Sequence, residues 1–495
     1  MMTIKLRFAP SPTGYVHIGS LRTALYNYLY AKKNNGSYVL RIEDTDQTRF
    51  VEGALENLLD SLHWAGLEHD EGVMMDDQGQ IVQKGDNGPY IQSERLDIYH
   101  EYVKGLLQQK HAYPCFCSKE RLESIREQQK IEGKTPMYDR HCLSLTEEES
   151  SERIKAGEPH VIRLKIPQDK DMVFNDLVRG EVIIHSSEID DQVLIKSDGF
   201  PTYHFAVVID DHLMGITHIV RGEEWLTSTP KQVALYQYFK WDVPQFVHLP
   251  TVLNKDKKKL SKRQGDVSVG DFRQKGYLPE ALINYLALIG WSPLENKEIF
   301  DLQELVEAFS FDRVSKTGGV FDLEKLNWMN NQYIKKTDSR RLLHLCVPYI
   351  LATGLDNEAN IEKNPSWYLA ILDLIKEKID YLSQIQDYLS LFYGDEVSLD
   401  NEEVVEVLQQ EHVKRLLNSF STKLVEADTI DETFTSEIFN ILKQETGAKG
   451  KGLFMPIRAA VTGELHGSDL GKIFQILGKD KMIKRINYVL ETLND

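Results

Sequence analysis

The chain has 495 residues, of which 41% are hydrophobic; this favours about three folded domains and excludes an intrinsically disordered protein. The chain has no run of eighteen apolar residues and no apolar signal-peptide core at its N-terminus, so we predict a soluble, cytoplasmic protein without a membrane partner. Four cysteines do not make a disulfide framework in so long a chain, and the net charge of −18 argues against a protein that coats nucleic acid non-specifically.

The charges are segregated along the chain. Residues 255–263 carry six basic side chains and one acidic one, and residues 449–485 carry eight basic and three acidic ones. Residues 395–411 carry seven acids and no base. Local basic segments can therefore contact anions although the whole chain is acidic.

The N-terminal residues predict one strand–turn–helix–strand unit. Apolar residues alternate over residues 4–9, prolines and a glycine interrupt residues 10–14, and helical spacing follows over residues 21–29. A second strand is predicted at residues 38–42. In a parallel sheet, ligands bind at the carboxyl ends of such strands, here the turn and residues 43–46.

The middle of the chain resembles an insertion followed by a return to the sheet. Residues 110–190 combine a helical stretch near 118–129 with short strands such as 161–166. We expect the sheet to resume in three short apolar runs, at residues 194–195, 206–209 and 216–220.

The C-terminal part predicts helices. Helical periodicity begins near residue 278 and continues over residues 331–495. Glycines predict breaks near Gly354, Gly394 and Gly467 and at residues 447–452.

His17 and Gly19 lie at the predicted start of the first helix. Backbone N–H groups at a helix N-terminus attract phosphate oxygens, and an imidazole can donate a further hydrogen bond. The alternative is a helix start that Ser20 caps, with an incidental histidine.

The segment Lys259-Leu260-Ser261-Lys262-Arg263 offers a second phosphate site. A lysine loop can close over a triphosphate and neutralise the charge that develops as pyrophosphate leaves. The alternative is a solvated run of charges.

Charged residues at the predicted strand ends suggest a site for a zwitterion. Arg7 could bind a carboxylate and Glu43 an ammonium group, or the two side chains could simply pair with each other. Arg221 could supply a second carboxylate clamp, or form a salt bridge with Glu223 or Glu224.

Three cysteines suggest a metal site in the predicted insertion. Cys115, Cys117 and Cys142 could bind zinc with a fourth ligand from Tyr138 or His141, or could be small buried side chains. Cys346 lies in an apolar helical stretch and is predicted to be core.

Four motifs in order carry a family resemblance: RFAPSPTGYVHIGS at residues 7–20, RIEDTD at 41–46, PTYHFAVVIDDHLMGITHIVRGEEW at 201–225 and KLSKR at 259–263. The whole chain resembles the bacterial glutamyl-tRNA synthetases, which are class I aminoacyl-tRNA synthetases. The resemblance implies an α/β Rossmann-type catalytic domain with an inserted α+β acceptor-binding domain, followed by an all-α anticodon-binding domain. The implied boundaries are 1–110 and 193–250 for the catalytic halves, 111–192 for the insertion, 251–330 for the KMSKS-type loop and stem-contact region, and 331–495 for the anticodon-binding domain.

The resemblance also implies roles for individual residues. The residues implied for ATP are His17, Gly19, Ser20, Lys259, Ser261, Lys262 and Arg263. Those implied for glutamate are Arg7, Ser11, Glu43, Tyr203 and Arg221, with Glu224 and Trp225 near ATP and the tRNA end. Lys451, Arg458 and Lys472 are candidate tRNA contacts, and Cys115, Cys117, Tyr138 and Cys142 the candidate zinc ligands. Ser20 replaces the second histidine of the HIGH-type signature, and Ser144 stands where zinc-bearing relatives have a histidine.

The implied reaction joins L-glutamate to tRNA(Glu) with ATP and Mg²⁺, in a protein that we expect to be a monomer. The alternatives are a glutaminyl-tRNA synthetase, a glutamyl-queuosine synthetase, another HIGH-type nucleotidyltransferase and a non-catalytic tRNA-binding paralogue. The helical C-terminal third disfavours the first three, and the intact Lys259–Arg263 segment disfavours the last.

Overall fold

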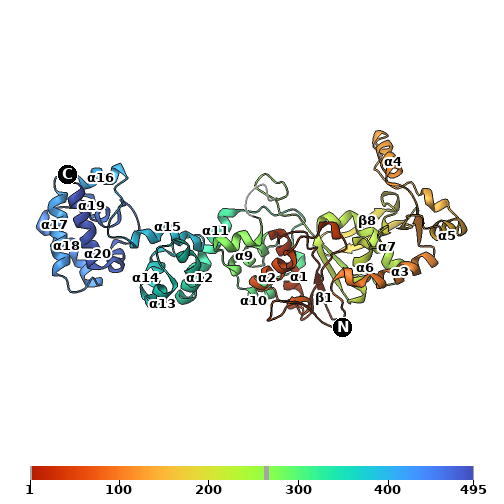
Figure 1. Ribbon diagram of the computed structural model, residues 1–495, viewed down its shortest axis with the longest axis horizontal. Coiled ribbons are helices and arrows are strands. Elements are labelled where there is room, and N and C mark those ends of the chain that lie inside the picture. Colours follow the sequence, from red (N-terminus) through yellow and green to blue (C-terminus); the bar gives the residue numbers. More distant parts are fainter. Residues whose placement is uncertain (1–2, 261–266, 494–495) are drawn as a thin grey trace. The chain divides into compact units, whose positions relative to one another are not determined.

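The computed structural model describes residues 3–260 and 267–493. The chain forms two compact units (Figure 1). The first comprises Met1–Gln274 and Pro279–Leu323, and the second Lys275–Leu278 and Glu324–Asp495. The first unit is α/β and the second is helical, which confirms the predicted fold class.

An eight-stranded sheet with the order β4-β3-β2-β1-β10-β11-β7-β8 forms the centre of the first unit. Neighbouring strands from β3 to β7 are parallel, and β4 and β8 pair antiparallel at the two edges. Since β2 and β10 flank β1, the strand order reverses at β1, and such a switch point opens a crevice at the carboxyl ends of the strands. The strands are β1 (Lys5–Phe8), β2 (Ser37–Leu40), β3 (Glu71–Met75), β4 (Ile81–Lys84), β7 (Asp171–Asp176), β8 (Gly180–His185), β10 (His218–Gly222) and β11 (Gln245–Leu249).

Helix α1 begins directly after the Pro/Gly turn and contacts β1, β2 and β10. Leu21, Leu25 and Leu29 are fully buried on it, as their helical spacing predicts. The predicted N-cap, Ser20, is wrong: His17 caps α1, because its Nδ1 accepts the Gly19 N–H at 3.0 Å. The helices that accompany the sheet are α1 (Ile18–Lys33), α2 (Ala54–Trp64), α3 (Leu96–Gln108), α6 (Tyr203–Leu213), α7 (Thr229–Phe239), α8 (Val269–Lys275), α9 (Pro279–Leu288) and α10 (Leu302–Ala308).

Two of the three apolar runs expected in the main sheet lie elsewhere. Residues 206–209 are part of α6, in which all residues from Phe205 to Asp211 are buried. Because this stretch has no exposed polar face, its apolar run shows no helical periodicity. Residues 194–195 belong to β9, which pairs with β6 in a separate three-stranded sheet. Only the run at 216–220 joins the main sheet, in β10.

The segment predicted as an insertion contributes to both sheets. The small sheet and its helices comprise β5 (Ala112–Cys115), α4 (Lys119–Ile131), α5 (Glu147–Lys155), β6 (Val161–Leu164) and β9 (Val193–Ile195). The β7–β8 hairpin, in contrast, extends the main sheet, because Asp176 of β7 pairs with Phe246 of β11. The hairpin turn therefore lies beside strands that are distant in sequence.

The second unit consists of helices, and four of its breaks lie at or near the predicted glycines, whereas others, such as 427–431, contain no glycine and were not predicted. Gly447, for example, ends α18 with a left-handed φ of 75°, which suits glycine. Phe420 of α17 and Phe474 of α20 pack with ring centroids 5.3 Å apart in its core. The helices are α11 (Leu323–Lys336), α12 (Ser339–Ala352), α13 (Glu358–Lys363), α14 (Pro365–Ile375), α15 (Ile385–Leu389), α16 (Glu402–Leu408), α17 (Val413–Glu426), α18 (Glu432–Thr446), α19 (Lys451–Thr462) and α20 (Leu470–Thr492).

Candidate active site

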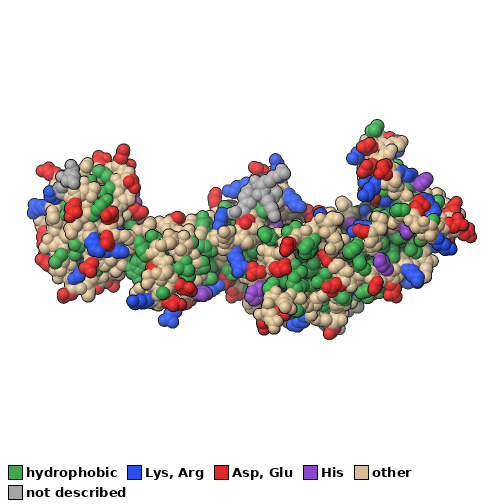
Figure 2. All heavy atoms as spheres, viewed as in Figure 1, with side chains coloured by type: hydrophobic (Ala, Val, Ile, Leu, Met, Phe, Trp, Pro, Cys, Tyr) green, Lys and Arg blue, Asp and Glu red, His purple; other side chains and the backbone are tan. Residues whose placement is uncertain are grey.

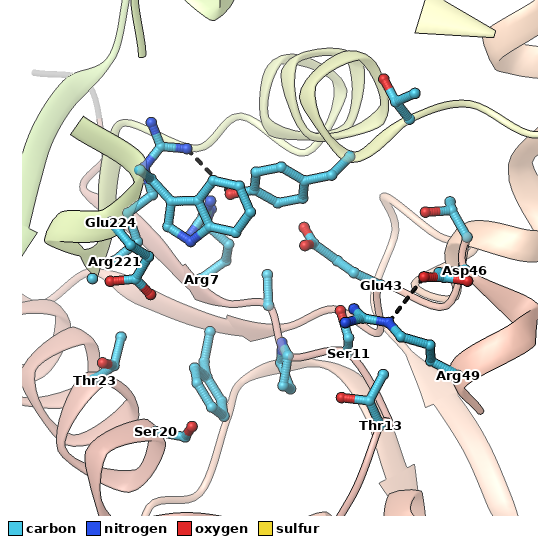
Figure 3. A pocket seen from close by; sticks show the side chains of 18 of the residues that line it. Arg7, Ser11, Thr13, Ser20, Thr23, Glu43, Asp46, Arg49, Arg221 and Glu224 are labelled. Atoms are coloured by element: carbon cyan, nitrogen blue, oxygen red, sulfur yellow. Dashed lines mark hydrogen bonds and ion pairs between the residues drawn. The ribbon is translucent and has the colours of Figure 1, made fainter. Parts of the chain in front are cut away.

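Two adjoining pockets open at the carboxyl ends of β1, β2 and β10. The larger has a volume of about 620 Å³ and the smaller of about 430 Å³. Four residues line both pockets: Ser20, Thr23, Gly222 and Glu224. Figure 3 shows the larger pocket, with Arg7 and Arg221 on one side, Glu43 opposite them, and Ser11 and Thr13 on the Pro/Gly turn below. The crevice expected at the switch point beside β1 is therefore present, as these two pockets.

Arg7 and Arg221 bring two guanidinium groups into the larger pocket from neighbouring strands. Arg7 is only 3% exposed, and its Nε donates to Asp211 Oδ1 at 3.0 Å. The alternative that Arg7 and Glu43 simply pair with each other is wrong, because Arg7 pairs with Asp211 and Glu43 with Arg41, each at 3.0 Å. Arg7 and Glu43 both still line the pocket.

Behind Arg7 lies a buried network of six charged side chains whose charges balance. Its members are Arg7, Glu43, Arg41, Arg95, Asp210 and Asp211. Burial by itself lowers the pKa of Arg7 and of Arg41. The negative charge of Asp211 outweighs this effect, so that the pKa of both groups lies above the ordinary value. Burial raises the pKa of Glu43, and Arg41 and Arg7 limit that rise. Arg7 and Arg41 therefore stay charged although they are buried.

The polar partners of Arg221 are neutral. Its Nη1 donates to the Tyr203 hydroxyl at 3.2 Å, its Nη2 to Thr229 Oγ1 at 2.7 Å, and its Nε to His248 Nε2 at 3.1 Å. The expected alternative of a salt bridge with Glu223 is wrong, since Glu223 pairs with Arg179 at 2.5 Å. Among the described ion pairs none includes Arg221, so its positive charge is available to an anion in the pocket.

Aromatic side chains close the pocket beside Arg221. Tyr203, at the start of α6, and Trp225, in the 3-10 turn after β10, pack with ring centroids 4.2 Å apart. Burial raises the pKa of Tyr203. Burial, together with the charges of Lys231 and Arg221, lowers the pKa of the neighbouring His204 to about 3, so this ring is neutral.

His17 and Lys259 line the same, smaller pocket. Because His17 Nδ1 accepts the Gly19 N–H, the neutral ring carries its proton on Nε2. Gly19 leaves the helix start open, since a Cβ there would lie 3.2 Å from the His17 ring. These features suit an anion at the first turn of α1.

Backbone hydrogen bonds fix the described chain before and after residues 261–266. Ile18 N–H donates to the Val267 carbonyl, and Val269 N–H donates to the Val16 carbonyl, both at 2.9 Å. On the other side, Leu260 N–H donates to the Val252 carbonyl at 3.0 Å. The predicted ATP residues Ser261, Lys262 and Arg263 lie outside the described residues. The described chain on both sides of them is thus fixed at the smaller pocket.

Glu224 lies on the boundary between the two pockets. Its carboxylate approaches Gly222 so closely that a Cβ at Gly222 would overlap it. A side chain at position 222 would displace the Glu224 carboxylate, which is exposed at the boundary.

The predicted zinc residues come together in the small-sheet region. The sulfur atoms of Cys115, Cys117 and Cys142 lie within 4.8 Å of one another. The Tyr138 hydroxyl lies 3.3 Å from the Cys115 sulfur and 3.4 Å from the Cys117 sulfur. Burial raises the pKa of Cys117 to about 11. Three sulfurs this close together fit three positions of a tetrahedral Zn²⁺ site, and the Tyr138 oxygen, close to two of them, is the candidate fourth ligand.

The three candidate tRNA contacts differ in their surroundings. Lys451 at the start of α19 and Lys472 in the first turn of α20 are exposed. Arg458 is partly buried, and its Nη2 donates to the Ser468 carbonyl at 2.9 Å, so it fixes the loop between the two helices. On the face of the second, helical unit that Figure 2 shows, acidic and basic side chains are interspersed.

The residues that support the arginines were not among the predicted site residues. Asp211 supports Arg7 and also accepts from Arg41, while Thr229 and His248 support Arg221. One signal was available: two consecutive acids, Asp210 and Asp211, interrupt an apolar run, and a buried acid requires a partner.

Comparisons with known proteins agree with this geometry. Residues 3–328 match the family model described as tRNA synthetases class I (E and Q), catalytic domain, and residues 341–490 match an anticodon binding domain. The chain is 54% identical over 493 residues to a glutamate–tRNA ligase of Alkaliphilus metalliredigens, covering 100% of both chains. It is 52% identical over 488 residues to that of Clostridioides difficile, covering 99% of both.

Among solved structures, one is a glutamate tRNA ligase from Elizabethkingia meningosepticum in complex with its amino acid. It superposes with a TM-score of 0.89 at 35% identity, over 99% of this chain and 100% of that one. No described helix has the length and hydropathy needed to cross a membrane.

Proposed function

The chain belongs to the class I tRNA synthetases of the E and Q type, and we propose that it joins L-glutamate to tRNA(Glu), with ATP converted to AMP and pyrophosphate. One observation carries the proposal: a pocket whose buried charged groups include two guanidinium groups and a carboxylate adjoins a pocket with a helix N-terminus, an imidazole and a lysine. The first set suits a dicarboxylic amino acid, and the second suits a nucleotide phosphate chain.

Glutamate would occupy the larger pocket. Its two carboxylates would pair with Arg7 and Arg221, and its ammonium group with Glu43. The hydroxyl groups of Ser11 and Tyr203, which also line the pocket, would complete the polar contacts. Because Arg221 has neutral partners, the charged side-chain carboxylate of glutamate is favoured over the amide of glutamine.

In the first step, the glutamate α-carboxylate attacks the α-phosphorus of Mg-ATP and pyrophosphate leaves. His17 would donate from Nε2 to a phosphate oxygen, with Gly19 and Ser20 at the same helix start. Lys259, Lys262 and Arg263 would neutralise the charge that develops on the leaving group, and the Ser261 hydroxyl would donate a hydrogen bond to it. Catalysis would rest on positioning and electrostatics, without a protein nucleophile.

In the second step, the terminal ribose hydroxyl of tRNA attacks the carbonyl carbon of the glutamyl-adenylate and AMP leaves. Glu224 and Trp225 would border the tRNA end, since Glu224 lines both pockets and Trp225 the glutamate pocket. The mixed anhydride would thus form and react at the boundary of the two cavities.

We assign tRNA contacts to three parts of the chain. Residues 111–192 would bind the acceptor stem between catalytic halves 1–110 and 193–250, residues 251–330 would contact the stem, and residues 331–495 would bind the anticodon. Within the last part, Lys451 and Lys472 are the better phosphate contacts, and Arg458 would act mainly by holding the loop that precedes Lys472. We also propose that the protein acts as a monomer in the cytoplasm, where tRNA is charged.

Cys115, Cys117, Tyr138 and Cys142 would hold one Zn²⁺ ion, whose role there would be to stabilise the small sheet. Metal analysis of the purified protein should give about one zinc per chain. The Cys142→Ser variant should lose it and melt at a lower temperature, whereas Cys346→Ser should keep it. Equal zinc content in both variants would contradict the assignment.

Pyrophosphate exchange and tRNA charging test the function. Exchange is measured with glutamate and with glutamine, each with and without tRNA, and charging with purified tRNA(Glu) and tRNA(Gln). Glutamate-dependent charging of tRNA(Glu) is the expected result, and His17→Ala should slow adenylate formation by about 10²- to 10³-fold. Charging with glutamine in place of glutamate would identify a glutaminyl enzyme and refute the proposal.

A further inference from the structure

His248 lies behind Arg221 and out of reach of the pocket. Its side chain is fully buried, and it is absent from the residues that line either cavity. Its Nε2 lies 3.1 Å from Arg221 Nε, which donates to it. An arginine Nε–H can only donate, so His248 Nε2 must be an unprotonated acceptor.

Asp176 fixes the other side of the ring. Its Oδ2 lies 2.7 Å from His248 Nδ1 and accepts the His248 backbone N–H at 2.9 Å. With Nε2 unprotonated, the neutral ring carries its proton on Nδ1 and donates it to Asp176. Burial, with the charges of Arg221 and Arg179, lowers the pKa of His248 to about 4 although Asp176 opposes this, so the ring is neutral at pH 7.

Asp176 is itself held by the hairpin turn between β7 and β8. Its Oδ1 accepts the N–H groups of Val178 and Arg179 at 2.9 and 2.8 Å. This carboxylate therefore cannot rotate without breaking the turn. The chain of contacts runs from the hairpin through the imidazole to the guanidinium at the pocket wall.

We propose that His248 is a positioning residue for substrate selection: as a neutral acceptor oriented by Asp176, it holds the Arg221 guanidinium in the plane that presents its outer N–H groups to the glutamate carboxylate. This inference rests on the proposed function, because it takes glutamate as the ligand of Arg221. His248 touches no substrate atom, so its loss weakens glutamate binding and leaves the chemical step nearly unchanged.

Two amide substitutions separate the two ring nitrogens. In His248→Gln, the amide oxygen can take the place of Nε2 and accept from Arg221. In His248→Asn, the shorter amide reaches the place of Nδ1 and Asp176, and Arg221 Nε loses its acceptor. Both variants remove the imidazole, which makes each a control for the stability cost of the other.

Charging of tRNA(Glu) is measured with the full-length protein, varying glutamate at saturating ATP and tRNA. We expect the KM for glutamate to rise about tenfold or more in His248→Asn and to stay within about threefold of wild type in His248→Gln. The kcat and the KM for ATP should change little in both. In an Arg221→Lys background, His248→Asn should add no further increase, because lysine has no Nε–H for the ring to accept.

A similar KM for glutamate in the two variants would overturn the inference, as would an equal fall in kcat with no change in KM. Wild-type protein that does not charge tRNA with glutamate would instead refute the proposed function. If His248→Asn does not fold, nitrogen NMR of imidazole-labelled wild-type protein, assigned with His248→Gln, still decides. A ring protonated on Nε2 at pH 7 would overturn the inference, and one protonated on Nδ1 supports it.

Discussion

Replacing Arg221 by alanine tests the selection of glutamate most directly. The guanidinium has five N–H groups, and three of them are used by His248, Tyr203 and Thr229. Two N–H groups thus remain for a ligand in the pocket. A hydrogen bond to a charged group contributes about 1.5–3 kcal/mol, so we take a loss of about 3 kcal/mol for the pair. That loss corresponds to a rise of about 100-fold in the KM for glutamate.

The matched control is Arg221→Lys. Lysine keeps the charge but loses the planar fork, so it should recover part of the affinity and leave the KM between those of wild type and Arg221→Ala. Initial rates of tRNA charging, with glutamate varied and ATP and tRNA saturating, give both values. A KM for glutamate within about twofold of wild type in Arg221→Ala would refute the reasoning, because the pocket would then hold the carboxylate without this cation.

Other predictions concern the buried charges and tRNA. Asp211→Asn should lower the free energy of unfolding in urea by about 3–5 kcal/mol, because buried Arg7 loses its ion-pair partner and buried Arg41 loses one of its partners. The exposed Asp395→Asn should change it little. In the folded protein the pKa of His248 is about 4, whereas in the unfolded chain it is about 6.5. The unfolded chain therefore binds the proton first, and the free energy of unfolding should fall as the pH drops from about 6.5 to about 4. The fall should be less steep in His248→Gln, which lacks this imidazole. Lys472→Ala should weaken tRNA binding and reduce the slope of log K against log salt by about one, whereas an unchanged slope would exclude this phosphate contact.

The residues at the pocket could be predicted because their positions follow from local sequence. Prolines and Gly14 force the turn after β1, and the alternating pattern of residues 4–9 fixes which side chains end that strand. In a parallel sheet, residues at the ends of neighbouring strands converge, which is why Arg7 and Arg221 share one cavity.

The ion-pair partners could not be predicted, because they depend on tertiary contacts. Arg7 pairs with Asp211, 204 residues away, although Glu43 is much closer in sequence. Helix α6, which carries Asp211, is buried along most of its length and has no polar face from which a helical period could be recognised. A short, fully apolar run fits a central strand equally well.

The β7–β8 hairpin has a consequence for attempts to separate the parts of this protein. A deletion that removes the whole of residues 111–192 would also remove an edge of the main sheet, together with the carboxylate that orients His248. A shortened catalytic domain must therefore retain residues 171–185 and be rejoined upstream of them. Strand pairing, and not position along the chain, therefore sets where the catalytic domain can be cut. That boundary falls inside residues 111–192, which the sequence presents as one segment.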